Sequence, residues 1–251
     1  MKHMTIRLAT IVLMLTTLIP TKAQQTQWLY DGLFYHINDD GTCSVVSTLK
    51  TGEIVIPQVA VIEGKNYIVT AILEGAFQSK DKITSIDLPN SVTSIGEYAF
   101  LGCTGLTTIK LPDALAEIST GTFSLCTGLT SVALPSALST IGSEAFYNCT
   151  GLISLHLPNL LTSIGDHAFF NCSNLAVIAI PNTLESIGDD AFLNCSKLTS
   201  IYLPGTITHI GTRAFSNCTG LTSVIIPNSI TALESSVFSG CSSLASVTLP
   251  E

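Results

Sequence analysis

Charged residues are scarce in this chain of 251 residues. Only 11% are Asp, Glu, Lys or Arg, while 46% are hydrophobic, so the composition excludes a disordered polyelectrolyte and allows a substantial buried core. Basic residues are the scarcer charged class, with 10 Lys and Arg against 18 Asp and Glu. The formal charge of −8 argues against nucleic acid or an anionic membrane as the main partner.

Motifs that carry catalytic chemistry are also absent. The sequence contains no His-x-x-x-His, no Gly-x-Ser-x-Gly, no phosphate-cradling glycine loop and no Cys-x-x-Cys. Its serines and threonines are plentiful, but no base accompanies them in a pattern that would activate a nucleophile. We therefore expect a protein that is not an enzyme and that uses no cofactor and no metal ion.

Long apolar runs are missing apart from one at the N-terminus. A weakly basic start (Lys2 and Arg7), a short apolar core over residues 6–19 and small residues around Ala23 are typical of a secretory signal peptide. The apolar core is shorter than the roughly 20 residues that a membrane span needs. We expect cleavage of residues 1–23 rather than an uncleaved anchor. This would leave 7 basic and 18 acidic residues, a charge of about −11, no membrane span and a secreted or cell-surface protein.

What the chain does contain is a repeat with a period of 23 residues. Prolines recur at positions 89, 112, 135, 158, 181, 204, 227 and 250, cysteines from 103 to 241 and phenylalanines from 77 to 238 at the same spacing. No insertion interrupts the run. A fixed period of this length predicts a solenoid, in which each coil buries its apolar face only by stacking on its neighbours.

Each repeat divides into three pieces. A Leu-x-x-Ile-x-Leu segment such as residues 106–111 has the spacing of a short strand, and the proline after it ends the ladder. A Leu-x-x-Ile segment returns, and a turn follows at glycines such as Gly165. The next residues, such as 97–100, begin with acidic or small polar side chains, as a short helix would. The fold class predicted is a repeat solenoid with a parallel β-sheet on one face, extended returns and short helical turns.

The region before the repeats is irregular. Residues 24–70 lack the period and alternate like strands, with a turn at residues 38–41 and a second short hairpin around residues 61–69. We expect them to form a β-hairpin cap and an irregular first unit, followed by a repeat array over residues 71–251. No atypical covering unit closes that array, which predicts either further residues or self-association through the open C-terminal edge.

The repeat at residues 161–181 and again at 184–204 reads Leu-x-Ser-Ile-Gly-x-x-Ala-Phe-x-Asn-Cys-x-x-Leu-x-x-Ile-x-Leu-Pro, with minor variation. This pattern closely resembles the BspA-like leucine-rich repeat of bacterial and some protist surface proteins, over residues 71–251. The resemblance implies an exported surface protein for adhesion or host interaction, with a host matrix or cell-surface protein as its partner. The alternative function is a structural spacer, or a fragment of a larger surface array, with no ligand of its own.

The cysteines of the repeat predict buried free thiols. Seven of the eight share one repeat position, so their side chains point the same way in successive coils. Strands about 4.8 Å apart bring such residues close, but parallel Cα–Cβ vectors do not give the crossed geometry of a disulfide. We interpret them as small apolar core residues.

One outward column of the sheet is the candidate binding face. Its members, one from each strand, are Asp87, Lys110, Ala133, His156, Ala179, Tyr202, Ile225 and Thr248. Alternation across a strand points all eight away from the core. Exposed aromatic and apolar groups mark interfaces, so the hypothesis is a protein-binding site of Lys110, His156, Tyr202 and Ile225. The alternative is an ordinary exposed β-surface, whose residues vary by neutral drift and bind no partner.

Two other repeat positions have structural interpretations. The acidic column of Glu144, Asp166, Asp189 and Asp190 offers the oxygen ligands that calcium takes, but we favour stabilisation of helix starts by these carboxylates. Four copies of an Asn-Cys-Ser/Thr sequon occupy a single repeat position, so we expect the asparagine to bond turn backbone between coils and not to carry glycans.

Overall fold

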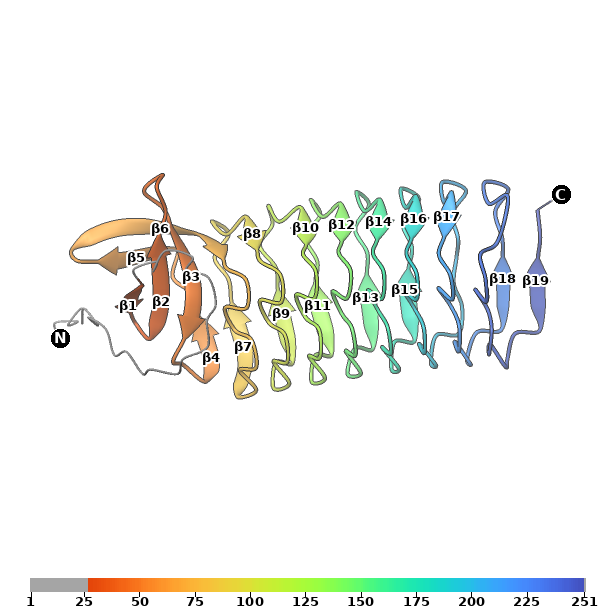
Figure 1. The fold of residues 1–251 in the computed structure, drawn as a ribbon, viewed down its shortest axis with the longest axis horizontal. Helices are drawn as coiled ribbons and strands as arrows, with labels where there is room; N and C mark the ends of the chain where they lie inside the picture. Colours follow the sequence, from red (N-terminus) through yellow and green to blue (C-terminus); the bar gives the residue numbers. More distant parts are fainter. Residues whose placement is uncertain (1–26, 251) are drawn as a thin grey trace, which may run out of the picture.

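The computed structural model describes residues 27–250, and the predicted signal peptide lies outside them. A small sheet region stands at the N-terminal end, and stacked coils extend from it in one direction to the C-terminus (Figure 1). No helix occurs within residues 27–250, so this range contains no helix that could span a membrane.

The N-terminal region is a twisted sheet that covers the first coil. Its strand order is β1-β2-β3-β6-β5, with antiparallel pairs β1/β2, β2/β3 and β5/β6 and a parallel β3/β6 pair. Tyr35, in β2, is fully buried. Its strands are β1 (Trp28–Tyr30), β2 (Leu33–Ile37), β3 (Cys43–Thr48), β5 (Val59–Ile62) and β6 (Lys65–Ile72). The sheet joins the array where β6 pairs in parallel with β8.

The coils of the array stack their strands in parallel in two rows, with a shift of 23 residues between paired strands from β7 onwards and of 31–32 residues between β4 and β7. The first row, which we call the sheet face, consists of β4 (Gly52–Val55), β7 (Ile83–Asp87), β9 (Thr108–Lys110), β11 (Ser131–Ala133), β13 (Ser154–His156), β15 (Val177–Ala179), β18 (Ser223–Ile225) and β19 (Ser246–Thr248). The second row consists of β8 (Ser94–Ile95), β10 (Glu117–Ile118), β12 (Thr140–Ile141), β14 (Ser163–Ile164), β16 (Ser186–Ile187) and β17 (His209–Ile210). The predicted solenoid with a parallel sheet on one side is therefore confirmed.

The predicted short helical turns are wrong. The segment after each short strand, which we call the arch, is a series of tight turns, as in residues 165–172. There the N–H groups of His167, Phe169 and Asn171 donate to carbonyl oxygens of the next coil at 2.7–2.8 Å, while the residues between them bond within the coil. His167 and Asn171 have φ of 56° and 55°, outside the helical region. A helix would use its own N–H groups internally, whereas the arch directs alternate N–H groups to the neighbouring coil and so stacks the coils.

Phenylalanine and cysteine form two continuous columns inside the array. The eight phenylalanine rings from Phe77 to Phe238 stack with centroids 5.1–5.7 Å apart and interplanar angles of 3–14°. Beside them, each cysteine Sγ donates to the carbonyl oxygen of the phenylalanine 26 residues earlier, as Cys172 does to Phe146 at 3.1 Å. These hydrogen bonds connect successive coils through the core.

The cysteines are free, as predicted, and burial governs their chemistry. From Cys103 to Cys218 the column is fully buried, whereas Cys241 is partly exposed. Burial raises the pKa of Cys103 and of Cys218 to about 12, and it raises the pKa of the central thiols of Cys149 and Cys172 as well. The thiols therefore act as neutral hydrogen-bond donors in the core.

Asparagine forms a third, shorter column, at the end of the arch in four consecutive coils. The sequon asparagines from Asn148 to Asn217 all have φ of 55–63°, and asparagine tolerates this left-handed conformation well. Asn171 Nδ2 donates to Asn148 Oδ1 at 2.7 Å, and Asn217 repeats the contact with Asn194 at 3.0 Å. The expected bond from the asparagine side chain to turn backbone is thus replaced, in these two pairs of coils, by a bond between side-chain amides.

Candidate functional site

The sheet face separates buried from exposed positions with a period of two. In β9, β11 and β13 the middle residue is buried and both flanking residues are exposed. All eight members of the predicted outward column, from Asp87 to Thr248, are exposed. The column therefore points to solvent as the strand alternation requires.

The four predicted binding residues do not form one cluster. Tyr202 and Ile225 come from consecutive coils and are 62% and 67% exposed. Lys110 and His156 lie further along the column towards the N-terminus, and the Lys110 ammonium is 3.8 Å from the Asp113 carboxylate. Five coil steps of about 4.8 Å separate Lys110 from Ile225, a span of roughly 24 Å. One partner would have to lie along the array to contact all four.

Further exposed apolar side chains on or beside this face were missed by sequence reasoning, among them Val55, which is 60% exposed in β4 at the position of the outward column. Val177 is 62% exposed at the start of β15, in the coil before that of Tyr202, and Ile153 is 56% exposed just before β13. Val177 occupies the position two residues before the outward column, which faces the same way. Comparing that position between repeats would have found it, because its counterparts in β11, β13, β18 and β19 are serines.

The acidic column has a structural role, although not the one predicted. Asp166 Oδ1 accepts the N–H of Asp189 at 2.9 Å, and Asp189 Oδ1 accepts the N–H of Thr212 at 2.7 Å. Each carboxylate therefore caps backbone of the following coil rather than a helix. Within residues 27–250 no group of three or more His, Cys, Asp or Glu is arranged to hold a metal ion.

Asp190 belongs to a charged cluster that sequence reasoning did not find. Its side chain is only 4% exposed, and both of its oxygens pair with the Arg213 guanidinium, at 2.8 Å from Nε and 2.7 Å from Nη2. His167 Nε2 lies 3.3 Å from Asp190 Oδ2 on the other side. The three residues are 23 apart in sequence, so opposite charges one period apart were the available signal. The bidentate pair raises the pKa of Arg213 and fastens neighbouring coils together.

Comparisons with known proteins agree with this geometry. The family model for the BspA-type leucine-rich repeat region matches residues 70–199 and 164–251. A search of curated proteins found no match. Among solved structures, a leucine-rich repeat protein of T. pallidum is similar at 32% identity and a TM-score of 0.70, covering 76% of this chain and 88% of its own. A leucine-rich repeat protein from Bacteroides ovatus is similar at 28% identity and a TM-score of 0.52, covering 88% and 76%.

The family model matches the part of the chain in which the 23-residue coils lie. The predicted resemblance is confirmed, and the chain belongs to the BspA-type leucine-rich repeat family.

Proposed function

We propose that this protein is an exported surface solenoid that binds a protein ligand through its sheet face. The observation that carries the proposal is the exposed apolar run of Val177, Tyr202 and Ile225 in three consecutive coils, each at least 62% exposed. Stacking of coils accounts for the buried columns and gives no role to these three side chains. An exposed aromatic and apolar cluster on a rigid surface is the type of group that carries binding energy in protein interfaces.

Lys110 and His156 extend the proposed site towards the N-terminal end. A partner that lies along the sheet face would contact the apolar run at one end and these polar groups towards the other end. This arrangement suits a long contact with an elongated protein. The class of ligand we favour is an extracellular matrix or cell-surface protein of a host. The support for this class is the N-terminal sequence pattern of an exported protein and the family to which the repeats belong.

The test screens the chain without residues 1–23 for binding to a panel of purified extracellular matrix proteins. Surface plasmon resonance then measures the affinity for each protein that binds. Tyr202→Ser combined with Ile225→Ser is expected to weaken binding to the captured protein by about 10-fold or more. Leu160→Ser provides the matched control, because Leu160 is also an exposed apolar residue (58%) but lies in the turn between β13 and β14, outside both the sheet-face strands and the arches. Absence of saturable binding to every member of the panel would favour the spacer function, and unchanged binding by the double variant would place the site elsewhere.

A further inference from the structure

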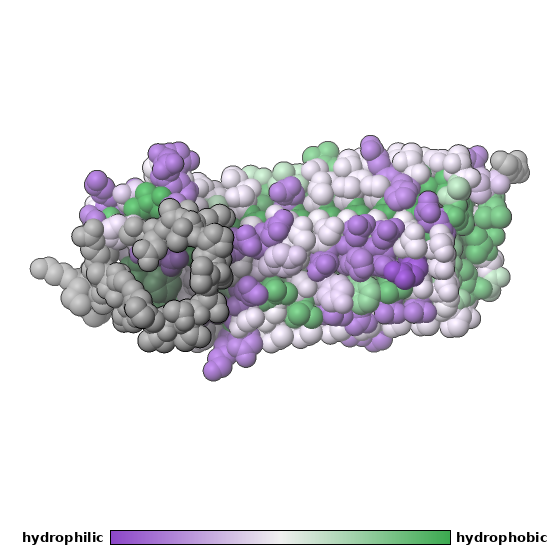
Figure 2. Space-filling model, viewed as in Figure 1, coloured by the Kyte–Doolittle hydropathy of each residue, from purple (hydrophilic) through white to green (hydrophobic). Residues whose placement is uncertain are grey.

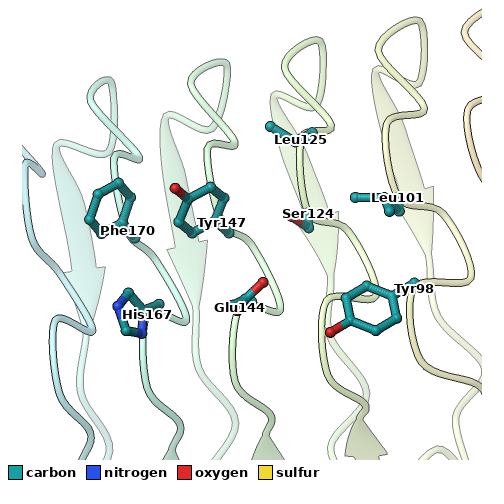
Figure 3. Close-up of a pocket in the computed structure, with 8 residues that line it drawn as sticks. All are labelled: Tyr98, Leu101, Ser124, Leu125, Glu144, Tyr147, His167 and Phe170. Carbon is teal, nitrogen blue, oxygen red and sulfur yellow. The ribbon is translucent and has the colours of Figure 1, made fainter.

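A shallow groove of about 610 Å³ lies on the arches, away from the sheet face. Eight residues from four consecutive coils line it: Tyr98, Leu101, Ser124, Leu125, Glu144, Tyr147, His167 and Phe170. Figure 3 shows seven of these side chains in two rows, one row from the first left-handed position of the arches and the other from three residues later, with Leu125 apart from both rows. Neither row belongs to the buried phenylalanine column.

The groove exists because one coil contributes small residues to both rows. Where neighbouring coils place Tyr98 and Glu144, this coil has Gly121, and its member of the second row is Ser124. Gly121 has φ of 60°, and a Cβ atom there would collide with the Tyr98 ring. The glycine therefore lets the tyrosine ring lie across the coil and leaves the hollow beside it. A second hollow of about 420 Å³, lined by Glu74, continues the groove past Tyr98.

Aromatic rings form the walls of this groove without being needed for the core. The Tyr147 and Phe170 rings are stacked, with centroids 4.7 Å apart and planes inclined by 11°, and both are partly exposed. Figure 3 shows the Tyr98, Tyr147 and Phe170 rings broadly face-on. The face of an aromatic ring carries negative electrostatic potential and attracts a cation that is placed over it.

Carboxylates lie beside the rings, and no Lys or Arg lines the groove or its continuation, although His167 lines the groove. Glu144 lines the groove itself, Glu74 lines its continuation, and Glu97 and Asp166 are exposed one residue before the first row. Between residues 83 and 212 the chain has only two Lys or Arg residues, Lys110 and Lys197, and Lys110 is on the sheet face. Arg213 forms a salt bridge with Asp190. Hydrophilic and hydrophobic patches alternate along the face seen in Figure 2.

We propose that this groove binds the Lys or Arg side chains of a basic, extended segment of a partner protein. Rings and carboxylates together complement a cation with an apolar stem, because the stem packs on the rings while the charged group reaches the carboxylates. From the coil of Tyr98 to that of Phe170 is three steps, roughly 14 Å, which accommodates two side chains from one face of an extended peptide at about 6.8 Å spacing. An anionic ligand would be repelled by the same carboxylates.

The proposal is independent of the sheet face, and its test keeps the two apart. Isothermal titration calorimetry with an Arg-Ser repeat peptide measures binding to the chain without residues 1–23, and the matching citrulline-Ser peptide removes only the charge. The expected result is saturable binding of the arginine peptide and at least about 5-fold weaker binding of the citrulline peptide. Tyr202→Ser with Ile225→Ser should leave the arginine peptide's affinity unchanged.

Variants within the groove identify the contacts. Tyr147→Ala, Phe170→Ala and Glu144→Gln are each expected to weaken binding of the arginine peptide by roughly 3-fold or more. Leu193→Ala, in the same row but outside the groove, and Glu185→Gln, an exposed carboxylate before β16, are the matched controls and should bind like the parent. Thermal unfolding midpoints verify that each variant is folded.

Three outcomes would overturn the proposal. One is equal affinity for the citrulline and arginine peptides. Another is loss of affinity in the Leu193→Ala and Glu185→Gln controls as large as in the groove variants, which would mean non-specific attraction to an acidic protein. The third is binding of a neutral oligosaccharide such as cellohexaose, with Tyr147 and Phe170 required, in the absence of any binding of the arginine peptide. That result would make the groove a carbohydrate site.

Discussion

The interior of the array and its sheet face are built by the same repeat but differ in how strictly they repeat. Inside, every coil from Phe77 to Phe238 places the same ring at the same position, because each ring's best neighbour is an identical ring 5.1–5.7 Å away. Outside, no two consecutive members of the outward column are the same residue. Repetition thus marks the positions at which coils stack, and variation marks the positions that are available for binding.

The strongest test of the interior is alkaline pH. Burial raises the folded-state pKa of the column thiols, to about 12 for Cys103 and Cys218, above the usual value near 9. A raised pKa of this kind contributes stability that is fully present below pH 9 and is lost as pH rises towards 12, because only the unfolded chain releases the protons. In this window each buried thiol is expected to lower the free energy of unfolding by about 1.4 kcal/mol per pH unit. The whole column is expected to lower it by several kcal/mol.

Urea denaturation at a series of pH values measures this slope. Cys172→Ala provides the control, because removing one thiol should make the slope shallower by about 1.4 kcal/mol per pH unit. A free energy of unfolding that stays constant between pH 9 and pH 11 would show that the thiols ionise within the folded protein.

The next largest effect is expected from the phenylalanine column. Phe169→Ala removes a fully buried ring that is stacked on both sides, by Phe146 and Phe192, and should lower the free energy of unfolding by about 3–5 kcal/mol. Val177→Ala, on the sheet face, should change it by less than about 0.5 kcal/mol. Equal losses in urea denaturation of the two variants would remove the distinction between interior and sheet face.

The charged cluster is intermediate between the two regions. Arg213→Ala leaves the buried Asp190 carboxylate without its bidentate partner and should cost about 1–3 kcal/mol. Arg213→Lys keeps the charge but loses the two-point geometry, so it should recover only part of the loss. The comparison is made by thermal unfolding, and full recovery by lysine would mean that charge alone stabilises the pair.

Among the contacts between coils, the asparagine column is expected to give the smallest effect on stability. Asn171→Ala loses the hydrogen bond to Asn148 and places alanine at φ of 55°, at a cost of about 1–2 kcal/mol. Asn171→Gly loses the same bond but tolerates the backbone, so it should cost less. If both variants unfold at the same temperature, the left-handed conformation is not a source of strain.

Much of the interior could be predicted from the sequence, because stacking copies one spacing onto every coil. The period located the strands, the buried phenylalanines and the free cysteines. The arches were misjudged for a physical reason. Their left-handed positions carry Tyr98, His167 and Arg213, residues that give no turn signal, and only bonding to the next coil holds them at φ of 54–56°. A short local pattern cannot reveal a conformation that a neighbouring coil imposes.

The exposed sites were only partly predictable for a related reason. The outward column followed from strand alternation, but its grouping into an apolar run with Val177 depends on a second exposed position. The groove depends on what one coil lacks, since Gly121 and Ser124 make the hollow that larger side chains line. Repeated residues are easily recognised in a sequence. A hollow made by small side chains in one coil can be recognised only when the neighbouring coils are placed beside it.

The most direct measurement of the central claim is urea denaturation of the Tyr202→Ser/Ile225→Ser variant beside its affinity for the matrix protein that the parent chain captures. Because both side chains are more than 60% exposed, the free energy of unfolding is predicted to stay within about 0.5 kcal/mol of the parent. The affinity of the same sample should fall by about 10-fold or more. Lower stability with unchanged affinity would contradict the account, since it would make these positions part of the stacking and not of the binding surface.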